Sequence, residues 1–210
     1  MLYLIKTPWW LKKMYSGCIW DIKTDEKKLY LTFDDGPDPF ATPFVLEQLK
    51  KYNAKATFFC IGKNVKEYFN LYSQMIEEGH KPGNHTYDHL NGWHTKDREY
   101  LENIAKAKQI IDSKLFRPPY GKISKFQLAQ LKADRYKLKT IMWSVLSGDF
   151  DNKISAENCF LNVTRNAKAG SIIVFHDSKK CFAKIQMALP KVLQYFSEKG
   201  FQFNAINDRD

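Results

Sequence analysis

The chain has 210 residues, 44% of them hydrophobic, and carries a formal net charge of +10. This length suits one domain with a substantial core, and the lack of repeats and low-complexity tracts excludes a solenoid or a disordered chain. The charge favours anionic partners. The lysines fall in scattered pairs without a nucleic-acid-binding motif, however, so the sequence predicts no specific nucleic-acid partner.

Residues 1–27 form an N-terminal segment that we expect to pack on the domain that follows. Trp9 and Trp10 lie beside Lys12 and Lys13, so an interfacial helix touching a membrane surface is the alternative. The segment has no uninterrupted apolar stretch, no small-residue cleavage site and too many charges to span a membrane. The lack of a signal peptide predicts a cytoplasmic protein, whereas a substrate in the cell wall would require association with the cell envelope.

From residue 28 to residue 210, short β-rich runs alternate with stretches that have helical spacing. Thr42 and Pro43 predict a helix start, with Thr42 as the N-cap and Pro43 as the first helical residue. Strict alternation of strand and helix predicts a parallel sheet covered by helices. The expected strands are Lys28–Phe33, Ala56–Ile61, Lys81–Asn84, Leu115–Arg117, Leu138–Val145, Ser171–Phe175 and Phe201–Ile206. Two further helices are indicated by Tyr100, Ile104, Ala107 and Ile111, and by Leu189, Val192 and Phe196.

The cysteines and two isolated histidines carry little functional signal. The four cysteines have no close spacing that would predict a disulfide scaffold or a zinc knuckle. Cys60 lies inside an apolar run and is expected in the core. His80 and His94 lie outside any motif and are expected on the surface.

Polar residues with catalytic chemistry follow several of the expected strands. Asp34 and Asp35 end the first run, His85 ends the third, Arg117 the fourth and His176 the sixth. Active residues at the carboxyl ends of several parallel strands are typical of barrel enzymes. A doubly wound open sheet would also place sites there, but no Gly-rich nucleotide loop follows the first strand. The sequence therefore favours a barrel.

One carboxylate and two imidazoles supply three ligands for a divalent metal. His85 and His89 are four residues apart, so within one helical turn they would share a face and could bind one ion. Consecutive residues of a strand point to opposite faces, so Asp34 and Asp35 cannot do the same task. The spacing does not decide which of the two binds the metal. A metal with an open coordination position activates water at neutral pH, which indicates a metallohydrolase.

Five segments carry these residues, in the order Thr32–Pro37, His85–His89, Arg117–Gly121, Trp143–Asp149 and Ile173–His176. Together they resemble the polysaccharide deacetylase family, which is carbohydrate esterase family 4 with its NodB-like catalytic domain. The resemblance implies an α/β fold, a distorted (β/α) barrel with about seven parallel strands. It implies that residues 28–210 are the catalytic domain.

The resemblance also implies roles for the residues of the first three segments. It assigns Asp35, with the two histidines, to the metal and Asp34 to the general base. Arg117 would pair with Asp34 and keep it ionised and oriented. The backbone N–H of Tyr120 would help the metal to stabilise the oxyanion of the tetrahedral intermediate.

His176 is expected to be the general acid that protonates the departing amine. The resemblance implies that Asp149 orients its imidazole. The chain departs from the common family pattern here, with Ser144 after the tryptophan and Phe150 after Asp149. Asp151 is therefore a second candidate for the orienting carboxylate.

Three apolar residues are expected to wall the pocket for the acetyl methyl group, namely Trp143, Ile173 and Phe175. Plain core packing is an equally suitable explanation for Ile173. The predicted activity is metal-dependent removal of acetyl groups from N-acetylated sugars in peptidoglycan or a chitin-like glycan. The alternatives are a related amidohydrolase acting on a non-sugar C–N bond and a non-catalytic glycan-binding protein.

The expected cofactor is Zn²⁺, although the same ligand set can bind Co²⁺, Ni²⁺, Mn²⁺ or Fe²⁺. The expected partner is an acetylated glycan. The sequence leaves the oligomeric state open, and we assume a monomer.

Overall fold

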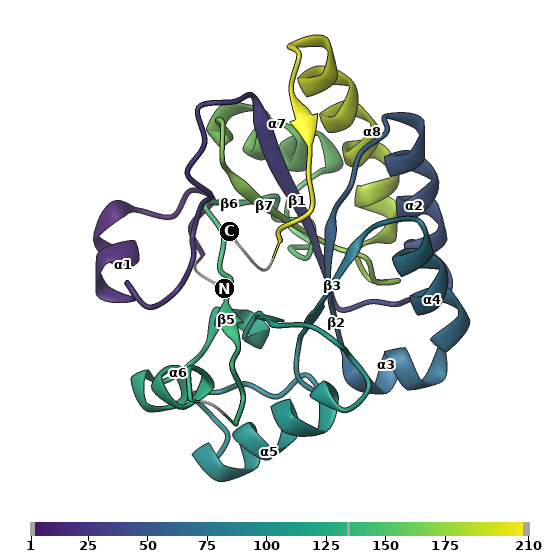
Figure 1. The fold of residues 1–210 in the computed structure, drawn as a ribbon. Helices are drawn as coiled ribbons and strands as arrows, with labels where there is room; N and C mark the ends of the chain where they lie inside the picture. Colours follow the sequence, from purple (N-terminus) through teal and green to yellow (C-terminus); the bar gives the residue numbers. More distant parts are fainter. Residues whose placement is uncertain (1–2, 134, 208–210) are drawn as a thin grey trace.

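The computed structural model describes residues 3–133 and 135–207, and within them the strands form one parallel sheet (Figure 1). The sheet order is β5-β4-β3-β2-β1-β7-β6, and β8 pairs with β1. The strands are β1 Lys28–Asp34, β2 Thr57–Cys60, β3 Lys81–Asn84, β4 Leu115–Phe116, β5 Lys139–Thr140, β6 Val145–Leu146, β7 Ile172–His176 and β8 Gln202–Phe203. The α-helices are α1 Trp9–Met14, α2 Ala41–Lys51, α3 Gly62–Glu67, α4 Phe69–Glu77, α5 Asp97–Lys108, α6 Lys125–Leu131, α7 Ala156–Asn166 and α8 Phe182–Glu198, with a 3₁₀ turn, η1, at Pro119–Gly121.

The prediction of a single strand at Leu138–Val145 is wrong. This run contributes two short strands, which lie at opposite edges of the sheet. Its first part, β5, pairs with β4, and its last part, β6, pairs with β7. Residues 141–144 connect the two, and Ile141 forms an isolated bridge to Ile19. The two end strands of the sheet are thus successive pieces of one segment, which requires the sheet to curl. The result is the distorted barrel with about seven parallel strands that the sequence predicted.

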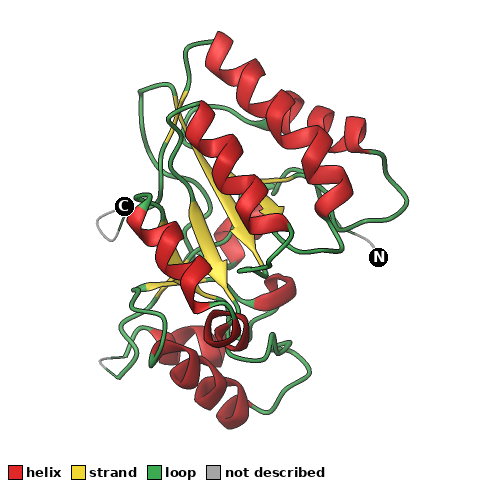
Figure 2. Cartoon of the chain, turned by 90° about the vertical axis from the view of Figure 1, so that its right-hand side faces the viewer, coloured by secondary structure: helices red, strands yellow, loops and turns green. Residues whose placement is uncertain are grey.

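The two faces of the central strands pack against different surroundings. Leu29, Leu31 and Phe33 of β1 belong to the main core cluster, together with apolar residues of α2, α7 and α8. Tyr30 belongs to a smaller cluster on the opposite face, and Thr32 shares that face by the two-residue period of a strand. Figure 2 shows helices covering the strands on the side that faces the viewer. Every second side chain of β1 therefore points into the curl of the sheet, toward the site.

The predicted helices exist, but the start of α2 was predicted incorrectly. The helix begins at Ala41, so Thr42 and Pro43 lie inside its first turn. The helix N-terminus is capped from outside, because the Asp38 carboxylate accepts hydrogen bonds from the backbone N–H groups of Phe40 and Ala41 at 2.9 Å. The Thr42 hydroxyl is then available for contacts with another loop. The apolar residues that predicted α5 and α8 are buried as expected.

The isolated histidines behave differently from each other. The prediction of a surface position is wrong for His80, which is buried and accepts a hydrogen bond from the N–H of Ala56 at 3.2 Å. Burial lowers the pKa of His80 to about 4, so the ring is a neutral packing group. His94 is exposed, and Cys60 is buried in the main core cluster, as predicted.

The N-terminal segment runs beside the β5–β6 connection. The N–H of Thr7 donates to the carbonyl of Ser144, and the N–H of Leu146 donates to the carbonyl of Ile5. Helix α1 has no buried residue, and Trp9 is 74% exposed. Within the described ranges, none of the helices has the length and apolar character that crossing a membrane requires.

Candidate active site

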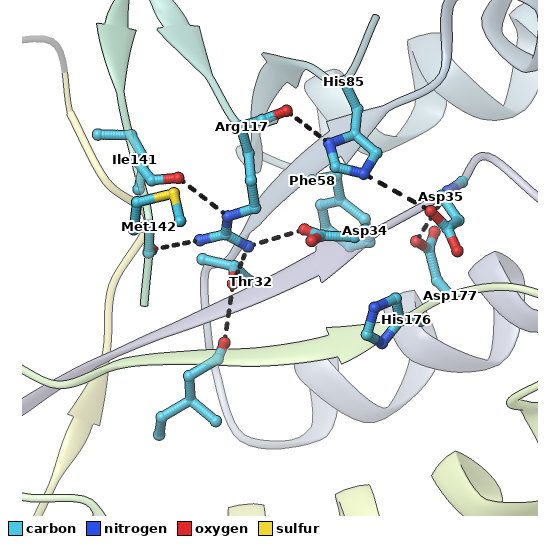
Figure 3. A network of polar contacts seen from close by, with 12 residues as sticks. Thr32, Asp34, Asp35, Phe58, His85, Arg117, Ile141, Met142, His176 and Asp177 are labelled. Atoms are coloured by element: carbon cyan, nitrogen blue, oxygen red, sulfur yellow. Dashed lines mark hydrogen bonds and ion pairs between the residues drawn. The ribbon is translucent and has the colours of Figure 1, made fainter. Parts of the chain in front are cut away.

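The carboxyl ends of β1, β3, β4 and β7 converge on one cluster of polar side chains (Figure 3). Asp34 and His176 are direct register partners at the ends of β1 and β7. His85 follows β3, and Arg117 follows β4. The structure therefore brings together residues that are up to 142 positions apart in the chain, because parallel strands end at the same edge of the sheet.

Asp35, His85 and His89 form a candidate metal site. Oδ1 of Asp35 lies 3.1 Å from Nε2 of His89 and 3.6 Å from Nε2 of His85. This carboxylate oxygen is buried and has no properly oriented hydrogen bond within the described residues. A buried acceptor without such a bond, facing two imidazoles, fits a divalent cation.

The surroundings of His85 prepare it for metal binding. Its Nδ1 lies 2.8 Å from the carbonyl oxygen of Arg117, an acceptor that fixes the proton on Nδ1 and leaves Nε2 free to coordinate. Burial lowers the pKa of His85 to about 4, although Asp34 and Asp35 oppose this shift. The imidazole is therefore neutral at pH 7, the form that binds a metal.

The Asp35 carboxylate is held ionised. Burial raises the pKa of Asp35. The contact with His89 and the charges of the nearby histidines lower this pKa by a larger amount, so the net shift is downward. Which of the two aspartates faces the histidines was open from the spacing alone. In the structure Asp35 faces the histidines, because its backbone has a φ of 81° and turns away from the direction of β1.

Left-handed backbone is concentrated at this site. Six non-glycine residues of the described chain have positive φ, and four of them lie here, namely Asp35, Thr86, His89 and Tyr120. Such conformations cost about 1–3 kcal/mol each and persist where the surrounding contacts enforce them. The site is thus built from loops that are held in shape by their neighbours.

Asp34 is buried and paired with Arg117. Nη1 of Arg117 donates to Oδ1 of Asp34 at 2.7 Å, and it donates to the hydroxyl of Thr32 at the same distance. Nε and Nη2 of the guanidinium donate to the carbonyls of Ile141 and Met142 at 3.2 and 2.9 Å. The fork of donors fixes the guanidinium, which in turn fixes the Asp34 carboxylate.

His176 is oriented by Asp149. Oδ1 of Asp149 lies 2.8 Å from Nδ1 of His176, and Oδ2 accepts the backbone N–H of His176 at 2.7 Å. The Asp151 carboxylate accepts the hydroxyl proton of Tyr3 at 2.8 Å and so does not compete for this position. Burial lowers the pKa of His176, but the charge and hydrogen bond of Asp149, together with the charges of Asp35 and Asp34, outweigh burial and raise it to about 10.

The predicted pocket residues divide into two groups. Trp143 is half-buried, and its ring lies 5.8 Å from the Arg117 guanidinium carbon. Ile173 and Phe175 are fully buried in the main core cluster, on the face of β7 opposite to His176. Their assignment to the pocket wall is therefore corrected to core packing, because an odd number of positions separates each from His176.

Tyr120 lies at the rim of the site. It is 54% exposed, and its ring centroid is 4.7 Å from that of His89. Its φ of 60° inside η1 turns the backbone sharply after two prolines. Tyr120 thereby borders the candidate metal site from the β4 side.

Asp177 is the site residue that the sequence did not indicate. It is fully buried, and burial raises its pKa well above the usual carboxyl range. Figure 3 shows its carboxyl group beside Asp35. The only sequence signal was its position directly after His176, at the end of a buried strand.

Comparisons with known proteins agree with this geometry. A family model described as polysaccharide deacetylase matches residues 21–138. A peptidoglycan-N-acetylglucosamine deacetylase of Bacillus cereus is 34% identical over 194 residues, which cover 90% of this chain and 91% of the relative. A chitooligosaccharide deacetylase of Azorhizobium caulinodans is 36% identical over 163 residues, which cover 74% of this chain and 76% of the relative.

Solved structures have the same fold. The crystal structure of a peptidoglycan N-acetylglucosamine deacetylase in complex with 4-naphthalen-1-yl-N-oxidanyl-benzamide is similar with a TM-score of 0.85 and 33% identity, over 95% of both chains. The sequence match and the curled parallel sheet therefore lead to the same conclusion. The chain belongs to the polysaccharide deacetylase family, carbohydrate esterase family 4.

Proposed function

We propose that this protein removes acetyl groups from N-acetylglucosamine residues of peptidoglycan in a metal-dependent reaction. The observation that carries the proposal is the placement of two polar pairs, Asp34–Arg117 and Asp149–His176, beside the Asp35 carboxylate. One pair offers a base and the other an acid. The substrate class rests on the peptidoglycan deacetylases to which the chain is similar.

Asp35, His85 and His89 would hold the metal, and Zn²⁺ is the first choice for an Asp-His-His ligand set. When bound, the ion supplies Lewis-acid polarisation of the amide carbonyl and lowers the pKa of the attacking water. Co²⁺, Ni²⁺, Mn²⁺ and Fe²⁺ suit the same donor set.

In this proposal Asp34 accepts a proton from the attacking water. Its Oδ1 accepts a hydrogen bond from Nη1 of Arg117, which orients the carboxylate and leaves the second oxygen to face the water. The Tyr120 N–H is proposed to donate to the oxyanion that forms on the carbonyl oxygen. In the addition step Asp34 therefore acts on the attacking water, and the Tyr120 N–H acts on the negative charge that develops on the carbonyl oxygen.

His176 is proposed to act in the last step, the departure of the amine. Collapse of the tetrahedral intermediate breaks the C–N bond, and the nitrogen needs a proton to leave as an amine. The raised pKa of His176 keeps it protonated at neutral pH, so it can supply that proton from the Nε2 side while Asp149 holds Nδ1.

Acetate release from peptidoglycan and from chitooligosaccharides, with metal content measured in parallel, tests this proposal. Asp35→Ala or His85→Ala is expected to lose tight metal binding and activity together. Asp34→Asn is expected to retain the metal and lose turnover, because an amide cannot accept the proton.

The substrate comparison discriminates between the two glycans. Faster acetate release from peptidoglycan supports the proposal, and faster release from chitooligosaccharides favours the activity named for the Azorhizobium relative. Unchanged activity in metal-free protein would contradict the mechanism. Loss of metal in Asp34→Asn, with activity intact once the metal is refilled, would show that the roles of the two aspartates are reversed.

A further inference from the structure

Asp177 contacts the chain on both sides of the metal-ligand candidate Asp35. Its backbone N–H donates to the carbonyl of Asp34 at 3.1 Å. Its side-chain Oδ1 accepts the N–H of Gly36 at 3.2 Å. The peptide groups before and after Asp35 are therefore both bound to one residue of a neighbouring loop.

The other carboxyl oxygen of Asp177 is bound as well. The hydroxyl of Thr42 donates to Oδ2 of Asp177 at 2.6 Å, and the same hydroxyl oxygen accepts the N–H of Asp38 at 2.8 Å. This chain of hydrogen bonds connects the loop after β1 to the loop after β7. The carboxyl group of Asp177 is thus fixed at both oxygens.

The packing around Gly36 is as close as the hydrogen bonds imply. A Cβ atom at Gly36 would lie 2.1 Å from Oδ2 of Asp177, well inside van der Waals contact. Only glycine allows the Asp177 carboxyl group to approach the backbone at this point. This contact therefore requires both the glycine at position 36 and the aspartate at position 177.

Asp35 needs such support. Its φ of 81° places it in the left-handed region, where a non-glycine residue pays a conformational cost of about 1–3 kcal/mol. This turn directs its Oδ1 toward His89 and His85. Without contacts on the flanking peptides, the residue would relax toward ordinary backbone and move its carboxylate away from the histidines.

We propose that Asp177 is a positioning residue that holds Asp35 in the turn required for metal binding, without touching the ion itself. The inference rests on the metal site of the proposed function and extends it to a residue outside the ligand set. Residues that orient ligands in this way typically contribute about 10- to 100-fold to metal affinity or activity.

Co²⁺ titration of the full chain, followed by visible absorption, tests the role without any substrate. Asp177→Ala is expected to weaken Co²⁺ binding by about 10- to 100-fold and to change the absorption spectrum, because the ligand geometry is no longer enforced. Asp177→Asn is expected to restore affinity and spectrum, since its amide oxygen can still accept the Gly36 N–H. Thr42→Val removes the hydrogen bonds of the Thr42 hydroxyl with Asp177 and Asp38 but leaves the contacts of Asp177 with Asp34 and Gly36, so it is expected to weaken binding less than Asp177→Ala does.

Thr57→Val is the matched control. The Thr57 hydroxyl is also fully buried and also accepts a backbone N–H, that of Ile206 at 2.9 Å, but it lies at the opposite end of β2 from the site. We expect a lower melting temperature and an unchanged Co²⁺ titration. This outcome separates loss of a buried hydrogen bond from loss of ligand positioning.

Two results would overturn the inference. One is a native-like Asp177→Ala variant, judged by circular dichroism, with unchanged Co²⁺ affinity and spectrum. The other is an Asp177→Asn variant that binds as weakly as Asp177→Ala. If Asp177→Ala does not fold, the Co²⁺ affinity of Thr42→Val is the deciding measurement. An affinity equal to that of the wild type would count against a positioning role for Asp177. Lack of deacetylase activity in the wild type would reject the proposed function while leaving these metal-binding results valid.

Discussion

The imidazole of His176 has a carboxylate on one side and an aromatic ring on the other. Asp149 contacts its Nδ1 at 2.8 Å, and the Phe150 ring lies 5.3 Å away in an edge-to-face arrangement. Burial opposes the charged form of the ring, and Asp149 favours it more strongly, so the pKa rises from the ordinary value of about 6.5 to about 10. Asp149 is therefore the largest of the influences that favour the protonated form of His176.

This environment predicts the alkaline limb of the pH–rate profile. As the proposed general acid, His176 would act in its protonated form, so activity is expected below its pKa and is expected to be lost as the pH rises through it. The limb of the wild type is expected well above pH 6.5, and Asp149→Asn is expected to move it to lower pH. A divalent ion at Asp35 opposes part of the rise, but it leaves the contribution of Asp149 in place.

Steady-state kcat and kcat/KM measured across pH check this prediction. His176→Ala is expected to lower turnover by about 10²–10⁴-fold and to remove the limb, while the metal stays bound. An Asp149→Asn profile that overlays the wild type would show that another group supplies the proton.

At the scale of elements, Arg117 connects parts of the sheet that do not all pair with one another. It follows β4, and its guanidinium contacts Asp34 and Thr32 of β1 and the carbonyls of Ile141 and Met142 between β5 and β6. The side chain is fully buried, and the guanidinium lies 4.1 Å from the ring centroid of Phe59. Arg117 therefore fills the inside of the curled sheet as well as pairing with Asp34.

Arg117→Ala is expected to lower the free energy of unfolding by about 3–5 kcal/mol, because it leaves the buried Asp34 carboxylate without its partner. Arg117→Lys retains the charge but not the fork of donors, so it is expected to recover part of this loss. Urea unfolding measures both.

The matched control is Arg98→Ala, which breaks the ion pair with Glu102 on the exposed face of α5. An exposed pair of this kind contributes less than about 1 kcal/mol. Equal losses in the two alanine variants would contradict a stabilising role for the internal pair.

At the scale of the whole molecule, the candidate metal site joins loops from different parts of the sheet. Asp35 follows β1, whereas His85 and His89 follow β3, with β2 between these strands. An ion bound to all three would cross-link the loops in the folded state only. Folding and metal binding are therefore thermodynamically linked.

Metal addition is expected to raise the melting temperature of the apoprotein. At a free metal concentration 100 times the dissociation constant, the linkage contributes about 2.7 kcal/mol. A chain of this size gains about 2–4 °C for each kcal/mol. Calorimetry with and without a chelator measures the shift, and His89→Ala is expected to abolish it. A shift of equal size in that variant would place the bound ion elsewhere.

Local patterns of the sequence predicted the general architecture and the residues that would share one site. The alternation of runs and helical stretches predicted the parallel sheet, and the position of Asp35, His85 and His176 at strand ends predicted one shared site. These inferences succeeded because the periodicity of side chains and the ends of parallel strands are properties of short segments. Boundaries such as the start of α2 were less accurate, because Asp38 caps that helix from a preceding turn.

Contacts between distant segments were decided by the tertiary structure alone. The left-handed turn at Asp35 directs this carboxylate, and not that of Asp34, toward the histidines. Asp151 accepts a hydrogen bond from Tyr3, whereas Asp149 contacts and orients His176. The curl of the sheet divided the run at residues 138–145 between two edges, and it buried Asp177 against Gly36. The physical reason is the same in each case. A sequence pattern specifies which face a side chain occupies, whereas its partners depend on which other segments pack against that face.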